Sequence, residues 1–62
     1  MDLMNTRILD RAFKRHEYIH VGRFFQSAGL LGIPKVSAQK RLVWLVNKGV
    51  VRKKNRWFLE LP

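Results

Sequence analysis

The absence of cysteine is the feature that most limits how this chain of 62 residues can fold. A domain of this size buries only about 60% of the surface that its unfolded chain exposes, so its stability is marginal. Disulfides stabilise many small domains, and none can form here. A cysteine-based zinc site is excluded too, and two histidines are too few for a structural one. We therefore expect a single domain over residues 1–62, with no metal, that is well packed or completed by a partner.

The breaks in the sequence are those of a folded domain rather than of a membrane protein. The longest uncharged run, residues 24–34, spans 11 residues, whereas a membrane-spanning helix needs about 20. The first residues lack the basic-then-apolar order of a signal peptide. We therefore expect no membrane contact and a cytoplasmic location. Five residues divide the chain into short segments: Gly22, Gly29, Gly32, Pro34 and Gly49.

The positive charge of the chain is strong and unevenly distributed. Thirteen Lys and Arg residues against four Asp and Glu give a formal charge of +9. Residues 18–59 contain nine of the basic residues and no acidic one, whereas residues 1–17 are nearly balanced. An excess of this sign attracts polyanions. Because the membrane alternative is disfavoured, nucleic acid is the polyanion that we expect.

Three segments have the apolar periodicity of helices. Residues 4–15 repeat apolar side chains at i, i+4 spacing, with Asn5 or Thr6 as the expected N-cap. Residues 21–31 show the same spacing, and the Gly-Ile-Pro sequence that follows ends this helix. Residues 35–48 form the third helix, and its expected buried residues are Ala38, Leu42, Leu45 and Val46.

The end of the chain is predicted to form a β-hairpin over residues 50–61. Its strands are residues 50–53 and 56–61, and Asn55 supplies the left-handed conformation of a tight turn. Since a hairpin is not stable alone, Ile19 is expected to add a third strand. Alternation and composition place the larger apolar side chains in the core: Phe13, Phe24, Phe25, Trp57, Leu59 and Leu61. The two histidines, His16 and His20, are expected at the surface or as caps.

The order of these elements resembles the winged helix-turn-helix family of DNA-binding domains over residues 5–61. In such domains an alanine precedes the turn glycine by four residues, as Ala28 precedes Gly32 here. The spacing from Leu45 to Gly49 is similar to the family's passage from the recognition helix into the wing. Ile33 and Ala38 also match, as does the aromatic return strand at residues 57–59, whereas Ser27 stands where the family usually has leucine.

The resemblance implies an α+β fold, a three-helix winged helix-turn-helix with a C-terminal β-hairpin wing. It also implies that helix 35–48 enters the major groove and that the wing tip contacts the backbone. Gln39 suits adenine, and Lys40 or Arg41 suits guanine or a phosphate. The predicted DNA-binding residues are Lys35, Ser37, Gln39, Lys40, Arg41, Lys53, Lys54, Asn55 and Arg56.

We expect a sequence-specific protein for double-stranded DNA, a small transcriptional regulator of a phage or prokaryote that lies with the nucleoid. Because a chain of this length has no room for a sensor domain, we expect it to act with a second copy or a protein partner. Val43 and Trp44 are the expected contact residues, although Trp44 has two other predicted roles, a cap over the core or a DNA contact. RNA binding in a ribosome-associated protein and a winged helix that binds only protein are the alternatives.

Catalysis has little support in the sequence. Ser37 is the one hydroxyl side chain of the third helix, and no histidine or carboxylate is arranged around it. The four acidic residues are scattered, and no glycine-rich phosphate loop is present. We expect a protein that is not an enzyme and needs no cofactor or small-molecule ligand.

Overall fold

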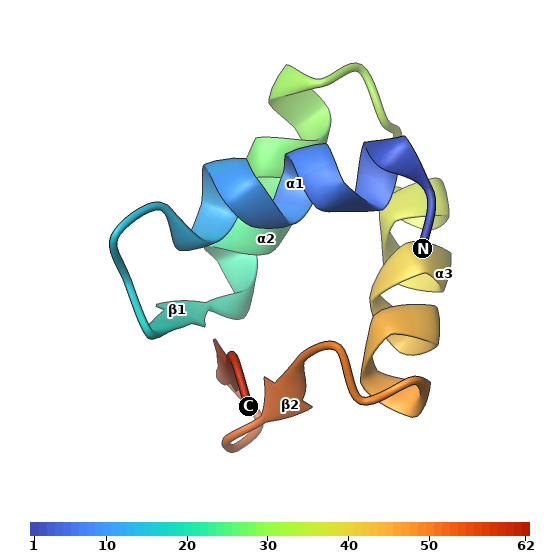
Figure 1. The fold of residues 1–62 in the computed structure, drawn as a ribbon. Helices are drawn as coiled ribbons and strands as arrows, with labels where there is room; N and C mark the ends of the chain where they lie inside the picture. The colour runs from blue at the N-terminus through green and yellow to red at the C-terminus, as the bar shows by residue number, and fades with distance from the viewer.

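The computed structural model describes residues 1–62 and contains three helices and a three-stranded antiparallel sheet. Figure 1 shows α1 lying across α2 and α3, with the sheet beside the far end of the helices. This α+β layout is that of a winged helix with a β-hairpin wing, so the predicted fold class is confirmed. None of the helices has the length and apolar character that crossing a membrane requires. In chain order the elements are α1 (Leu3–Phe13), β1 (Tyr18–His20), α2 (Val21–Leu30), α3 (Lys35–Asn47), β2 (Arg52–Lys53) and β3 (Phe58–Glu60).

The first helix begins and ends earlier than the predicted residues 4–15. Its N-cap is Asp2, whose carboxylate accepts a hydrogen bond from the backbone N–H of Asn5 at 2.8 Å. The predicted caps, Asn5 and Thr6, lie inside the helix, so that prediction was wrong. The helix stops before Arg15, whose φ of 61° is left-handed and incompatible with a continuing helix.

The ends of α2 and α3 explain the glycine spacing noted in the sequence. Gly49 follows the cap of α3 with a φ of 74°. The next residue, Val50, donates its backbone N–H to the carbonyl of Leu45 at 3.0 Å, which completes a Schellman motif. The α2 helix ends in the same way at Gly32, where φ is 82°. In this motif the glycine stands four residues after the accepting carbonyl, so the spacing is a requirement of helix termination.

The sheet has the strand order β1-β3-β2, and both pairings are antiparallel. Ile19 lies opposite Leu59, which confirms the predicted third strand. The Ile19 and Leu59 side chains face the helices and are buried. Their neighbours Tyr18, His20 and Phe58 therefore lie on the outer face of the sheet, because successive side chains alternate between faces.

The hairpin is shorter than predicted and its turn is built differently. Asn55 does not have a positive φ, so its predicted left-handed conformation was wrong. Its side-chain oxygen instead accepts hydrogen bonds from the backbone N–H groups of Trp57 and Phe58, at 2.9 and 3.0 Å. This side-chain turn holds the segment between the two strands out of the ladder, so β3 begins only at Phe58.

The core lies between the three helices and the inner face of the sheet. Phe13 and Phe24 are buried as predicted, whereas Phe25 is half-buried. Trp57 and Leu61 are 55% and 43% exposed, so their predicted place in the core was wrong. Both lie outside β3 and do not follow its alternation. The buried apolar residues are Ile8, Leu9, Ala12, Phe13, Ile19, Phe24, Ala28, Ala38, Leu42, Leu45, Val51 and Leu59.

Candidate nucleic-acid interface

One face of α3 packs on the core and the other is open to solvent. Ala38, Leu42 and Leu45 form the buried face. On the open face, four side chains at i, i+3, i+4 and i+7 spacing line a shallow groove: Val36, Gln39, Lys40 and Val43. The two valines are 66% and 59% exposed, which is unusual for apolar side chains of this size. The groove thus combines apolar contacts, an amide and a cation on one helix surface, which we call the α3 open face.

The N-terminus of α3 carries positive charge that no carboxylate offsets. Its N-cap, Pro34, makes no side-chain capping bond, and the first turn has no acidic residue. The first intrahelical bond runs from the N–H of Ala38 to the Pro34 carbonyl at 2.9 Å. The backbone N–H groups before Ala38 therefore have no partner in the helix. Together with the exposed Lys35 they favour an anion at this end.

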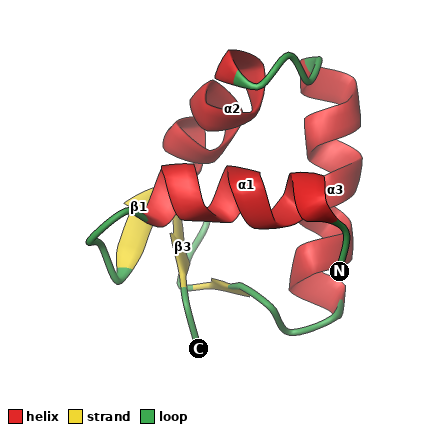
Figure 2. Cartoon of the chain, turned by 45° about the horizontal axis from the view of Figure 1, so that its top comes forward, coloured by secondary structure: helices red, strands yellow, loops and turns green.

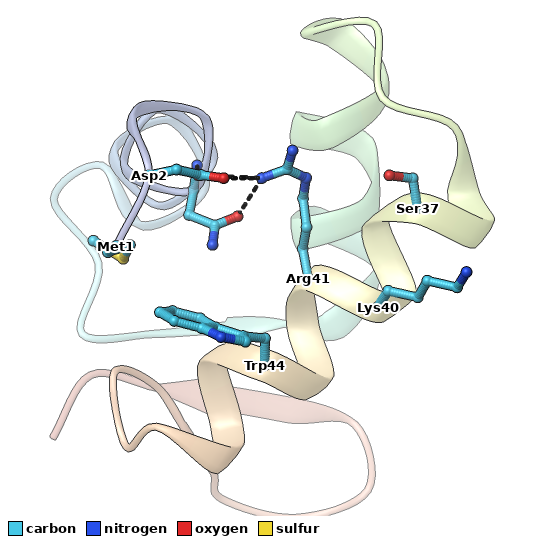
Figure 3. Close-up of a pocket in the computed structure, with 7 residues that line it drawn as sticks. Met1, Asp2, Ser37, Lys40, Arg41 and Trp44 are labelled. Carbon is cyan, nitrogen blue, oxygen red and sulfur yellow. Dashed lines mark hydrogen bonds and ion pairs between the residues drawn. The ribbon is translucent and has the colours of Figure 1, made fainter.

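Arg41, one of the predicted DNA contacts, is already engaged inside the protein. Its Nη1 donates to the two carboxylate oxygens of Asp2, at 3.2 and 3.0 Å, and to the side-chain oxygen of Asn5 at 2.8 Å. Figure 3 shows the guanidinium pointing away from α3 toward the N-terminus of α1. Its side chain is 28% exposed. Any contact of Arg41 with a base or phosphate has to compete with this ion pair.

The same contacts act on the acidity of Asp2. The hydrogen bond from the backbone N–H of Asn5 and, to a smaller extent, the Arg41 guanidinium hold the pKa of the Asp2 carboxyl below its ordinary value. Some desolvation opposes them without reversing the direction. Asp2 is therefore ionised at neutral pH, where it both caps α1 and orients Arg41.

An open pocket of about 500 Å³ lies between the N-terminus of α1 and α3 (Figure 3). The Trp44 ring extends across it toward Met1, and Trp44 is 39% exposed. Trp44 thus lies over the joint between α1 and α3 rather than over the core, where one of its predicted roles had placed it, and part of its ring is exposed. Ser37, also a predicted DNA contact, is half-buried at the margin of this pocket.

The wing tip supplies three exposed cations. Lys53 makes no ion pair. The Nζ of Lys54 lies 4.5 Å from the centroid of the Tyr18 ring, and the Arg56 guanidinium lies 5.8 Å from that of Trp57. The fourth predicted tip residue, Asn55, uses its side-chain oxygen inside the turn, so its role is to shape the tip.

Few of the basic residues are neutralised by carboxylates. The structure contains two ion pairs, Arg41 with Asp2 at 3.0 Å and Arg52 with Glu60 at 2.9 Å. The other eleven of the thirteen basic side chains have no carboxylate partner. Lys35 and Lys40 on α3 belong to this group, as do the three cations of the wing tip. Positive charge is therefore retained at the predicted basic contact residues other than Arg41.

Two groups of exposed residues were not singled out by sequence reasoning. Val36 completes the α3 open face. It stands three residues before Gln39 and seven before Val43, and this spacing indicates that the three side chains share one face of a helix. The second group is aromatic and lies on the outer face of the sheet, around Tyr18 and Trp57. The alternation of Tyr18 and His20 around a buried Ile19 would have indicated it.

Comparisons with known proteins identify no relative. No protein-family model matches the chain, and searches of the curated proteins and of the solved structures found no match.

Proposed function

We propose that this protein binds double-stranded DNA in a sequence-specific manner and acts as a small transcriptional regulator of the winged helix-turn-helix type. The observation that carries the proposal is the α3 open face, where apolar, amide and cationic side chains are exposed together beside an unneutralised helix N-terminus. A helix of this kind fits the major groove, whose base edges present methyl groups, donors and acceptors. The electrostatic potential around α3 is expected to be positive, because residues 18–59 contain nine basic residues and no acidic one.

The composition of the open face sets the expected base preference. Gln39 pairs with adenine through its amide, in the bidentate manner that this side chain favours. Val36 and Val43 lie on either side of it and contact thymine methyl groups. Lys40 contacts guanine or a phosphate, and Lys35 a phosphate at the helix N-terminus. We therefore propose a target site rich in A·T pairs at its centre.

The wing tip contributes contacts that do not depend on base sequence. Lys53, Lys54 and Arg56 are exposed and carry no carboxylate partner. They contact backbone phosphates beside the major-groove site, which fixes the orientation of α3. With Lys35 and Lys40 they amount to five phosphate contacts or fewer, so the logarithm of the affinity should fall with the logarithm of the salt concentration with a slope of about −4.

In the cell the protein is proposed to lie in the cytoplasm with the nucleoid and to act with a second copy or a protein partner. A symmetric dimer would place two α3 helices about 34 Å apart, one turn of DNA. Val43 and the exposed part of Trp44 remain the proposed contact residues on α3. A palindromic target site would support the second copy, and a single half-site would support a different partner.

Selection of bound sequences from random DNA duplexes tests the proposal. A recurring A·T-containing site is expected, with affinity measured by fluorescence anisotropy. Lys40→Gln should weaken binding to that site, whereas Arg11→Gln, which removes the same charge from the exposed surface of α1, should have a smaller effect. Gln39→Ala should cost about 1–3 kcal/mol, mainly at one base position.

Three results would contradict the proposal. Recovery of no common sequence, with equal affinity for all duplexes at every salt concentration, would leave only non-specific attraction. Tighter binding to structured RNA than to the selected duplex would favour the ribosome-associated alternative. Binding to one protein without any affinity for DNA would favour the protein-interaction alternative.

A further inference from the structure

We infer that the protein has a second binding site, for single-stranded DNA, on the outer face of its sheet. The site consists of four aromatic side chains, which we call the aromatic surface: Tyr18, His20, Trp57 and Phe58. Figures 1 and 2 both show β1 on the opposite side of the molecule from α3, so this site is separate from the α3 open face. It goes beyond the proposed function, which uses α3 and the wing tip, and it shares with that function only the wing-tip cations Lys54 and Arg56.

The four rings form a continuous row. The Tyr18 and Phe58 rings meet edge to face with centroids 5.9 Å apart, and Phe58 meets His20 in the same way at 5.5 Å. His20 and Trp57 are stacked with an interplanar angle of 14° and a centroid distance of 6.1 Å. Contacts between strands would account for these pairings alone, but not for the exposure of the two end members. Tyr18 and Trp57 are 52% and 55% exposed.

The exposed ring of Trp57 is carried on a backbone that is held on both sides. Its N–H donates to the side-chain oxygen of Asn55 at 2.9 Å, and its carbonyl accepts from the N–H of Val21 at 2.7 Å. The ring it stacks on is fixed as well, because Nδ1 of His20 accepts from the N–H of Gly22 at 2.9 Å and caps α2. The Trp57 backbone and the His20 ring are therefore held in place without a ligand, which lowers the entropy lost on binding.

Charge at the margin of the aromatic surface selects an anionic occupant. The Lys54 ammonium and the Arg56 guanidinium lie beside the Tyr18 and Trp57 rings. The Glu60 carboxylate, opposite Tyr18 in the sheet, is paired with Arg52 at 2.9 Å. Proteins bind unpaired strands without strong sequence preference through two components, aromatic rings that stack on the bases and cations that contact the phosphates.

The same chemistry excludes duplex DNA and gives RNA no advantage over DNA. Bases in a duplex are stacked on one another and present no open face, so only an unpaired strand can use the rings. A protein distinguishes RNA from DNA through groups that bond the 2′-hydroxyl. On this surface the Glu60 carboxylate and the Asn55 amide oxygen already have partners, so these two acceptors give RNA no advantage. The occupant that fits is a short single strand of DNA.

Anisotropy titrations with a single-stranded DNA of about 12 nucleotides test the inference. Trp57→Ala should weaken binding to this probe by about tenfold, since one stacked base is lost, while Trp57→Phe should retain most of the affinity. Leu30→Ala is the control, because it removes a 64% exposed apolar side chain from α2 and should leave the affinity for the single strand unchanged. Circular dichroism melting establishes that each variant is folded.

A second readout reports stacking directly. In a Trp44→Phe background the fluorescence comes from Trp57 alone, and single-stranded DNA should quench it, whereas duplex DNA should not. An unchanged affinity of Trp57→Ala, or an equal loss in Leu30→Ala, would overturn the inference. Much tighter binding of an RNA strand of the same sequence would overturn the assignment to DNA.

Different substitutions should weaken binding at the two sites. Lys40→Gln should weaken the duplex and leave the single strand unaffected, and Trp57→Ala should do the opposite. If no duplex sequence is selected but Trp57→Ala still weakens the single strand, the inference stands and the proposed function does not.

Discussion

At the scale of single residues, Asp2 has two structural roles. It caps α1 through the Asn5 N–H and holds Arg41 against the N-terminus of that helix. Neither partner was foreseen, because the sequence offers three good caps in the first six residues and gives no sign that Arg41 lies nearby. The residue that caps the helix, Asp2, is also the one that pairs with Arg41, 39 positions away in the sequence.

The lowered pKa of Asp2 makes a prediction about stability and pH. A carboxyl whose pKa is depressed in the folded state contributes stability that is present above its unfolded value of about 3.9 and is lost as the pH falls through the folded value. The free energy of unfolding in urea should therefore fall below about pH 4. Asp2→Asn keeps an N-cap without the charge, so the difference between the two proteins should shrink over the same range.

The outcome that contradicts this reading is a constant difference between wild type and Asp2→Asn from neutral to acidic pH. It would show that the carboxylate contributes only as a hydrogen-bond acceptor. The comparison isolates Asp2 from the other three acidic residues, which titrate in both proteins.

The valines of the α3 open face lead to a prediction about thymine. If Val43 contacts a thymine methyl group, replacing that thymine by uracil in the selected duplex removes one apolar contact. Affinity should fall by about fourfold, the equivalent of one buried methylene. Val43→Ala should already lack the contact, so uracil should make little further difference in that variant. Equal losses in the two proteins would place the methyl group elsewhere.

At the scale of elements, the ends of the helices were predictable from the sequence, and the start of strand β3 was not. The ends of α2 and α3 fall within one residue of the predicted 31 and 48, because Gly32 and Gly49 satisfy a local geometric rule. The position of Trp57 depended on where β3 begins. That was decided by the side chain of Asn55, whose hydrogen bonds shift the strand start without changing the alternating pattern.

The candidate site follows the same division. The exposure of Lys35, Gln39 and Lys40 follows from helical periodicity, which the sequence contains. The engagement of Arg41 and the row of rings on the sheet follow from contacts between distant segments. Periodicity along the sequence does not report contacts between distant segments, so these two features could be found only in the structure.

Two glycines should respond to the same substitution with opposite signs. Gly49→Ala places a side chain at a φ of 74°, which should destabilise the fold by about 1–2 kcal/mol. Gly29 lies inside α2, and an added Cβ there meets no atom within 4 Å. Gly29→Ala should therefore stabilise the fold, by up to about 1 kcal/mol. Chemical denaturation measures both, and destabilisation by Gly29→Ala would show that α2 packs more tightly than the structure indicates.

At the scale of the whole molecule, many like charges lie close together in a small volume, and their repulsion opposes folding. Eleven basic side chains without carboxylate partners occupy a molecule that measures 26 × 22 × 20 Å. The Debye length is about 30 Å at 0.01 M salt, longer than the molecule, and about 10 Å at 0.1 M. At the lower concentration every cation repels all the others, which destabilises the compact state.

Salt should have opposite effects on the Tm of the free protein and of the protein bound to DNA. Without DNA, the Tm should rise as the NaCl concentration increases from about 0.01 to 0.1 M, because screening removes repulsion. In the presence of excess target duplex the order should reverse, since binding stabilises the fold by mass action and salt weakens binding. Melting curves at a series of salt concentrations measure both trends. A Tm that falls with salt in the free protein would mean that the two ion pairs outweigh the repulsion, and a trend that DNA leaves unchanged would mean that the unneutralised cations do not meet phosphates.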